Sequence, residues 1–312
     1  MVDFDEINEH TELQRKETLK WARSMSEHSQ ERPGEERAGG GKKVYSIEAA
    51  LELIGGFGRF QGIMTSILFT NYIKQGLVYY PLPYMELMPQ FKCFNHVTNL
   101  FELCEPEDFC GKDVLMKYDY DAPTSLHNWV EKLDLACLPS EKIGYIGSAY
   151  FVGVLASVLV IPRLADIYGR KRPILYCQVG QLLAVLAFFV MTAYWQAVFL
   201  FFVFGLGFGG TVSVGVIYAQ EFMMHKHRAF CIAAYGVIDG AIVAFLVAYF
   251  YFISKEWQPW YAMCVLCQIW VVIGLLWLPE SPDFLYAKGR YDESKEVLMK
   301  IAKFNGANIT ED

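Results

Sequence analysis

The chain has 312 residues, of which 54% are apolar and only 20% are charged. This composition argues against a soluble protein, and the 16% of aromatic residues suits the aromatic belts of membrane proteins. The formal charge of −7 is unevenly spread, because acids gather in the N-terminal tail and in one long loop while basic residues mark short turns. The net charge therefore does not indicate a nucleic-acid partner.

The first 45 residues are polar and rich in Glu, and they lack the apolar core of a secretory signal peptide. We expect residues 1–45 to form a flexible cytosolic tail. The apolar residues between positions 46 and 54 have helical spacing, which predicts an amphipathic lead-in helix. A glycine-rich stretch then breaks this helix at the membrane edge.

Six apolar runs follow, and each has about the 20 residues that a helix needs to cross a bilayer. A buried soluble helix would explain one such run, but five neighbours of similar length make that interpretation weak. Lys74 interrupts the first run, which is the least certain span. The sequence thus predicts a six-helix transmembrane domain over residues 46–278, with runs at residues 60–80, 143–164, 173–194, 196–219, 230–253 and 260–278.

Basic residues cluster in the loops on one side of these runs, before the first, between the second and third, and between the fourth and fifth. Positive charge in short loops marks the cytoplasmic side. The opposite side holds residues 81–142, which we call the cysteine loop and which contain eleven acids against five lysines. We therefore expect the cysteine loop to lie outside the cytoplasm.

The cysteine loop contains four of the eight cysteines: Cys93, Cys104, Cys110 and Cys137. In an oxidising compartment they would form two disulfides, with three possible pairings. A zinc site is the alternative, but the spacings are irregular and include no CxxC. The other cysteines lie in apolar runs, where packing is the simplest role.

The turn between the second and third runs, residues 164–173, reads Leu-Ala-Asp-Ile-Tyr-Gly-Arg-Lys-Arg-Pro, and we call it the basic turn. It resembles the signature Gly-x-Leu-Ala-Asp-x-x-Gly-Arg-Lys/Arg of major facilitator transporters, except that Pro162 replaces the first Gly. Residues 218–228, with Tyr-Ala-Gln-Glu and a later Arg, and residues 279–306, which begin Pro-Glu-Ser-Pro, resemble two further motifs of these transporters. The cysteine loop and the Gly-Phe-Gly-Arg-Phe-Gln entry narrow the resemblance to the organic cation/anion transporters of the solute carrier 22-like family.

This resemblance covers roughly residues 46–306 and implies an all-α integral membrane fold. Its six transmembrane helices would form one half of a major facilitator fold, followed by cytosolic linker helices over residues 279–312. The resemblance also implies secondary transport of small organic ions by alternating access, in the plasma membrane or an organelle membrane.

Since the family's substrate site lies between two halves, we expect a longer parental chain or a second half-transporter. The alternative function is that of a half-length structural subunit in a larger membrane assembly.

The resemblance implies a gate at the cytoplasmic face, because the acid and the basic residues of this motif are thought to clamp the gate in the family. The candidate residues are Asp166, Arg170, Lys171, Glu221 and Arg228. The alternative is that they are ordinary solvated loop charges.

Charges within apolar runs cost about 2.5–3.5 kcal/mol at the helix centre and need a reason. Asp239 is a candidate for attracting a cation, or it is an acid bonded to a neighbouring helix. Lys74 would serve an anionic substrate or an ion pair, or extend to the membrane interface. Tyr218 and Tyr235 are candidates for stacking an organic cation, with packing as the alternative.

We expect no catalytic residue, cofactor or bound metal, and therefore no enzyme. The sequence contains no phosphate-binding loop and no serine in a nucleophile elbow. His225 and His227 lack a third metal ligand nearby.

Overall fold

The computed structural model describes residues 50–52 and 56–307. The chain divides into two compact units, Met1–Leu53 and Ile54–Asp312. The predicted cytosolic tail lies outside the described residues, whereas residues 50–52 of the predicted lead-in helix are helical. The elements below all belong to the second unit.

Five helical segments of the described residues are long and apolar enough to cross a membrane, and they match five of the six predicted runs. Two of them contain a π-helical stretch. Their elements are α8 (Tyr145–Tyr168), α9 (Lys171–Val190), α10 (Tyr194–Leu206) with η1 (Gly209–Val214) and α11 (Gly215–Gln220), α12 (His225–Ala248) with η2 (Tyr249–Ile253), and α13 (Trp257–Trp277).

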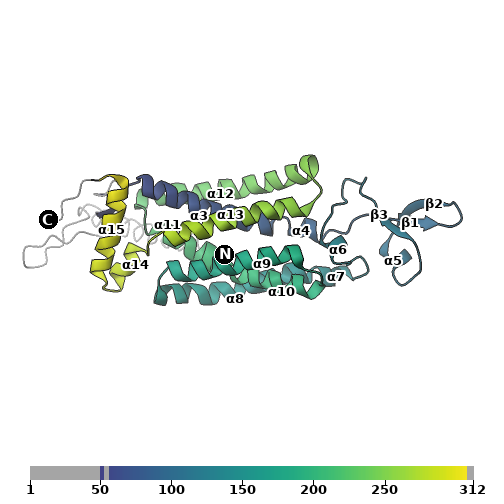
Figure 1. The fold of residues 1–312 in the computed structure, drawn as a ribbon, viewed down its shortest axis with the longest axis horizontal. Helices are drawn as coiled ribbons and strands as arrows, with labels where there is room; N and C mark the ends of the chain where they lie inside the picture. Colours follow the sequence, from purple (N-terminus) through teal and green to yellow (C-terminus); the bar gives the residue numbers. More distant parts are fainter. Residues whose placement is uncertain (1–49, 53–55, 308–312) are drawn as a thin grey trace, which may run out of the picture. The chain divides into compact units, whose positions relative to one another are not determined.

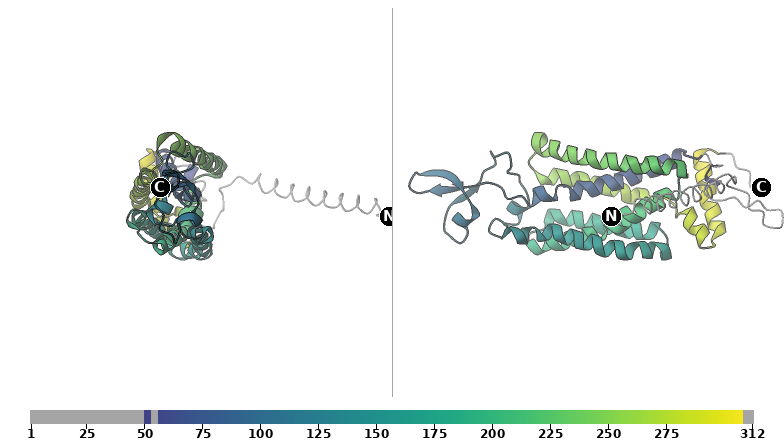
Figure 2. Two further views of the ribbon diagram at one scale, coloured as in Figure 1. Left: turned by 90° about the vertical axis from the view of Figure 1, so that its right-hand side faces the viewer. Right: turned by 180° about the vertical axis from the view of Figure 1, so that it is seen from behind.

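The first apolar run forms helix α3 (Arg59–Tyr79), which is 21 residues long. It is not among the five most apolar segments, because polar side chains interrupt its sequence. Helix α3 packs against α12 and α13, and both ribbon views show the three helices side by side (Figures 1 and 2). The helix exists as predicted, while its role as a sixth span stays a prediction.

Close helix contact at small residues joins α8 to α10 and η1. A Cβ atom added at Gly153 of α8 would lie 2.9 Å from the backbone nitrogen of Leu206. The amide of Gly209 donates a hydrogen bond to Ser157 Oγ at 2.7 Å. Glycines in this part of the chain therefore allow backbones to approach, as they do in other membrane helix pairs.

The cysteine loop folds into short elements, and the prediction of an all-α fold is wrong here. A three-stranded antiparallel sheet has the order β2-β1-β3. Strands of three to five residues give too little alternation to be recognised in a sequence. The elements are α4 (Leu82–Met85), β1 (Phe91–Asn95), β2 (Leu100–Cys104), α5 (Pro106–Phe109), β3 (Met116–Tyr118), α6 (Trp129–Lys132) and α7 (Ser140–Ile143).

Both predicted disulfides are confirmed, with the pairing Cys93–Cys104 and Cys110–Cys137. The first joins β1 to β2. The base of the loop is held by Trp129, which is fully buried and meets Phe201 edge-on with ring centroids 5.1 Å apart. The loop is therefore anchored in the same apolar core as the long helices.

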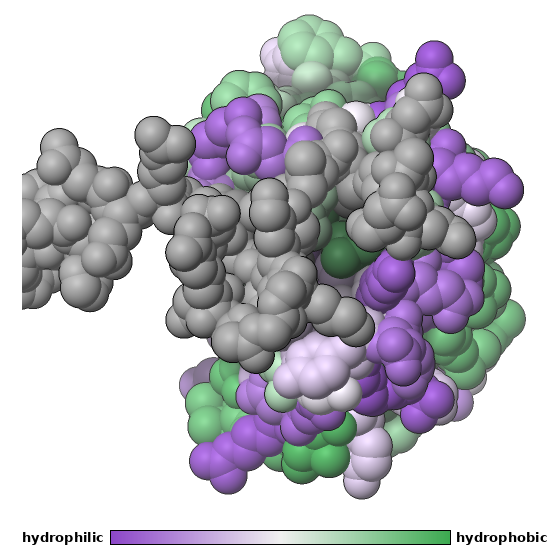
Figure 3. Space-filling view, turned by 90° about the vertical axis from the view of Figure 1, so that its left-hand side faces the viewer, coloured by the Kyte–Doolittle hydropathy of each residue, from purple (hydrophilic) through white to green (hydrophobic). Residues whose placement is uncertain are grey.

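Two helices follow α13: α14 (Pro282–Ala287) and α15 (Tyr291–Asn305). Ser281 caps α14, since its hydroxyl accepts a hydrogen bond from the Phe284 amide at 3.1 Å. The two helices lie at the end of the bundle opposite the sheet (Figure 1). Seen from that end, hydrophilic side chains cover much of the coloured surface and hydrophobic ones run along its flanks (Figure 3).

Candidate functional site: a clamped basic turn and a tyrosine-lined cavity

The basic turn changes direction at Gly169, where α8 ends. The φ of Gly169 is +103°, a conformation that side chains other than glycine rarely adopt. A Cβ atom there would also lie 2.9 Å from Cδ of Glu280. Glycine at this position therefore lets a carboxylate from a distant part of the chain reach the turn.

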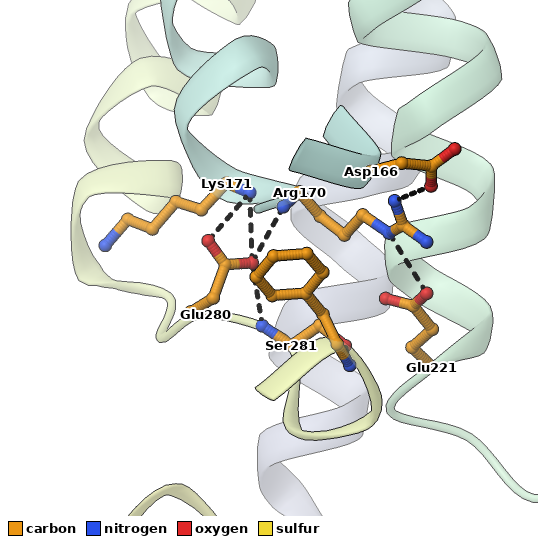
Figure 4. Close-up of polar contacts among 7 residues, drawn as sticks. Asp166, Arg170, Lys171, Glu221, Glu280 and Ser281 are labelled. Carbon is orange, nitrogen blue, oxygen red and sulfur yellow. Dashed lines mark hydrogen bonds and ion pairs between the residues drawn. The ribbon is translucent and has the colours of Figure 1, made fainter. Parts of the chain in front are cut away.

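Glu280 places that carboxylate on the first turn of α9. Its oxygens accept hydrogen bonds from the backbone amides of Arg170 at 2.9 Å, Lys171 at 3.2 Å and its own neighbour Ser281 at 2.9 Å. A helix N-terminus favours an anion because its first amides have no partner within the helix. The segment after α13 is thus fastened to the basic turn (Figure 4).

Arg170 joins two carboxylates from different helices. Its guanidinium pairs with Asp166 at the end of α8, and its Nε lies 3.2 Å from Glu221 Oε1, just after α11. The side chains of Arg170 and Glu221 are 16% and 14% exposed, against 67% for Asp166. The pair with Glu221 is the shielded one, so water weakens it less. Together the two acids raise the pKa of Arg170, although burial acts in the opposite direction.

The other two predicted gate residues lie differently. Lys171 contributes its backbone amide to Glu280, and its ammonium extends away to the Leu276 carbonyl at 3.1 Å (Figure 4). Nε of Arg228 donates to the Met223 carbonyl at 3.2 Å. Within the part of the chain that the structure describes, no ion pair joins Arg228 to the other charges.

Sequence reasoning missed Glu280 as a member of this cluster. Its motif was visible, but the motif predicted only the start of the linker. The available signal was an acid directly before the Ser-Pro that opens α14. Because its partners lie 109 and 110 positions away, local spacing does not reveal the contact.

A cavity of about 280 Å³ lies between α3, α8, η1 and α12. Asp239 is the one charged residue that lines this cavity, and the phenol rings of four tyrosines line it as well. Asp239 Oδ2 accepts a hydrogen bond from the Tyr80 hydroxyl at 2.5 Å. Among the described residues, no basic side chain forms an ion pair with this carboxylate. The lining residues are Tyr72, Gln75, Gly76, Tyr79, Tyr80, Tyr150, Phe151, Val154, Phe208, Val212 and Asp239.

The two predicted tyrosines do not line this cavity. Tyr235 packs behind it, with its ring 5.2 Å from that of Tyr72, a lining residue. Tyr218 is fully buried, and its hydroxyl donates a hydrogen bond to the Pro279 carbonyl beside the basic turn. Direct contact with the cavity instead comes from Tyr72, Tyr79 and Tyr80 at the end of α3.

Lys74 is fully buried and does not extend to an interface. Its ammonium donates to Gln181 Oε1 and lies 5.8 Å from the centre of the Phe204 ring. Gln75 donates to the same oxygen at 3.2 Å and to Thr211 Oγ1 at 2.5 Å. Since Gln75 lines the cavity, a chain of hydrogen bonds connects Lys74 to the cavity wall.

A second group of buried amides joins three helices near Lys74. Gln178 of α9 donates to Asn71 of α3, and Gln268 of α13 donates to Gln178 Oε1 at 2.6 Å. These amides hydrogen-bond to one another between helices, as polar side chains in membranes do, although Gln268 Oε1 has no partner among the described residues. Within the described residues, no group of His, Cys, Asp and Glu has the arrangement of a metal site.

Known proteins match much of this chain. The family model described as "Sugar (and other) transporter" matches residues 78–310. Synaptic vesicle glycoprotein 2B of Rattus norvegicus is 27% identical over 187 residues, which cover 54% of this chain and 27% of that protein.

Two further relatives have transport in their names. Hexose transporter HXT10 of Saccharomyces cerevisiae is 27% identical over 172 residues, 53% of this chain and 32% of that protein. Organic cation transporter 1 of Caenorhabditis elegans is 27% identical over 189 residues, 61% of this chain and 32% of that protein. The chain thus spans about a third or less of the length of these curated relatives.

Proposed function

The chain belongs to the sugar (and other) transporter family of the major facilitator superfamily, and from this we propose that it moves small organic cations across a membrane. The mechanism is secondary transport by alternating access, in which this chain is the N-terminal half. The other half belongs to a longer parental chain or to a second polypeptide.

Helix α3 is the sixth span in this proposal. Its polar residues Asn71, Lys74 and Gln75 all make hydrogen bonds to neighbouring helices, and all three are buried. Polar side chains that hydrogen-bond to neighbouring helices inside a bundle are compatible with a membrane position. The interruption at Lys74 therefore supports an inward-facing side of α3 and does not argue against a span.

The proposed orientation follows from charge and cysteine chemistry. The basic turn, α14 and α15 lie in the cytoplasm, because positive short loops mark that side. The cysteine loop lies outside, where its two disulfides are stable. Residues 1–45 are a cytosolic tail, and the plasma membrane is the proposed location.

The observation that supports a cation is the unpaired carboxylate in a tyrosine-lined cavity. The only hydrogen bond to Asp239 from another described side chain comes from a neutral phenol, Tyr80. A positively charged ligand gains from the carboxylate and from the faces of Tyr72 and Tyr79. A sugar would gain from hydrogen bonds instead, but aromatic and aliphatic side chains make up most of the cavity lining.

The basic turn acts as the cytoplasmic gate in this proposal. Arg170 connects α8 to the end of α11, and Glu280 connects α9 to the linker. These contacts hold the cytoplasmic ends of the helices together in one state, and opening the pathway would require them to break.

Uptake of tetraethylammonium by cells that express the chain together with the other half of the transporter tests the proposal. Asp239→Asn keeps the shape of the side chain and removes its charge, so we expect uptake to fall about tenfold or more. Asp292→Asn, an exposed acid on α15, is the matched control and should leave uptake unchanged. Unchanged uptake by Asp239→Asn would remove this residue from the site. Absence of uptake by the wild-type chain, together with a fixed partner on native gels, would favour the structural-subunit alternative.

A further inference from the structure

A second cavity, of about 370 Å³, adjoins the Asp239 cavity. Tyr79, Tyr80 and Phe151 line both cavities, so these three aromatic side chains form the partition between them. The second cavity also reaches the start of the cysteine loop and the first turn of α8, where Gly147 and Ser148 line it. The second cavity therefore lies next to the first one, toward the cysteine loop.

Glu86 is the one charged residue that lines this second cavity. It follows α4 and is half-buried. Its Oε1 is shielded from water and has no hydrogen-bond partner among the described residues. None of the ion pairs within residues 50–52 and 56–307 includes Glu86. A carboxylate oxygen without a hydrogen-bond partner in a partly dry cavity is costly, and a cation would compensate that cost.

We propose that Glu86, with the faces of Tyr79 and Phe151, forms an outer binding site for organic cations, from which a cation passes the aromatic partition to Asp239. The ligand class is a quaternary ammonium or a protonated amine with small alkyl groups. Its charge would meet the carboxylate, and its alkyl groups would meet the rings. This inference rests on the proposed function, because that function supplies the ligand class and the inner site.

The same geometry allows a purely structural role for Glu86. A Cβ atom added at Gly147 would lie 3.4 Å from Glu86 Oε1, so the carboxylate lies beside the first turn of α8. A carboxylate there stabilises the helix N-terminus. The two roles differ in one respect: a helix cap alone does not bind a soluble cation.

Competition between a proton and the cation for Glu86 makes the cation affinity of the outer site depend on pH. Burial raises the pKa of Glu86 to about 7, although the Gly147 amide acts in the opposite direction. The titratable groups that face it are the phenols of Tyr79, Tyr80, Tyr194 and Tyr261. A cation binds the ionised carboxylate, so affinity should be about tenfold weaker at pH 6 than at pH 8 for one competing proton.

Equilibrium binding of radiolabelled tetraethylammonium to the full chain in phosphatidylcholine nanodiscs tests the outer site. Asp239→Asn serves as the background, because it leaves Glu86 as the only carboxylate lining either cavity. We expect this variant to keep one bound cation per chain, with the tenfold pH dependence. Adding Glu86→Gln should abolish that binding, whereas adding Glu141→Gln, an exposed acid on α7, should not.

The outcomes separate the two proposals. Binding that survives Glu86→Gln, or a flat profile from pH 6 to pH 8 in the Asp239→Asn background, overturns the outer site. If Glu86→Gln fails to fold, Glu86→Asp replaces it and must retain pH-dependent binding. If the outer site binds but uptake is insensitive to Asp239→Asn, the inner site of the proposed function fails alone. A wild-type chain that binds no cation overturns both.

Discussion

The acids of this molecule fall into two regions that differ in how completely they are paired. At the basic turn, Glu280 accepts hydrogen bonds from three backbone amides, and Glu221 is paired with the Arg170 cation through Oε1, while its buried Oε2 has no partner among the described residues. In the cavities, Asp239 has a phenol as its partner, and Glu86 has an oxygen with none among the described residues. The first region uses its charges to hold helices together, and the second leaves its charges open to a ligand.

The largest effect at the paired region should follow removal of the Glu280 carboxylate. Glu280→Ala leaves three amides without their acceptor, and we expect the free energy of unfolding to fall by about 3 kcal/mol. Unfolding in mixed micelles by denaturant titration measures it. Glu293→Ala is the control, because its pair with Arg290 is about half exposed and water screens it, so its loss should change stability little. Equal losses for both variants would contradict the claim that Glu280 holds the segment after α13 to the basic turn.

The next effect concerns the glycine that lets Glu280 approach. Gly169→Ala introduces a side chain at φ +103° and against the Glu280 carboxylate, so we expect a loss of about 2 kcal/mol. The same titration measures it. Gly180→Ala on α9 is the matched control, since a Cβ atom there meets nothing within 4 Å. A Gly169→Ala variant as stable as the control would show that the turn has no such constraint.

The two partners of Arg170 should differ in importance. Glu221→Gln removes the shielded charge, and we expect a loss of about 1–2 kcal/mol. Asp166→Asn removes a charge that is 67% exposed, and we expect a change within about 0.5 kcal/mol. Thermal unfolding of the two variants under one set of conditions gives the comparison. A larger loss of stability for Asp166→Asn than for Glu221→Gln would mean that solvent exposure does not determine how much each ion pair contributes.

A separate effect is the pH dependence of stability at Glu86. Because the pKa of Glu86 is raised in the folded state, the stability that this group contributes is complete at low pH and is lost as the pH rises through about 7. Glu86→Gln has no proton to lose. The Tm of this variant relative to wild type should therefore increase from pH 5 to pH 8. Parallel Tm profiles would contradict the raised pKa.

The long helices and the basic turn could be predicted because they depend on local sequence. Apolar runs of about 20 residues predict helices by length alone, and Gly169 and Arg170 stand in a recognisable turn. The pairing at Arg170 with Asp166 is also local, since the two residues are four positions apart. The cysteines predicted two disulfides, although only the structure chose among the pairings.

The remaining features depend on contacts between distant segments. Glu280 reaches the basic turn from 110 positions away, and Tyr80 reaches Asp239 from 159 positions away. Helical spacing shows which face of a helix is apolar, but not which residue of another helix it meets. Tyr218 illustrates this limit, because its hydroxyl turns to the Pro279 carbonyl and not to the cavity.

The central claim is that an organic cation occupies the Asp239 cavity, and photo-crosslinking tests it most directly. A quaternary ammonium with a photoreactive group would be irradiated with the chain in nanodiscs, and the modified peptides identified by mass spectrometry. The account predicts labelling at Tyr72 or Tyr150, which line the Asp239 cavity and not the second one, and this labelling is prevented by excess tetraethylammonium and abolished by Asp239→Asn. Labelling confined to other helices, or unaffected by Asp239→Asn, would contradict it.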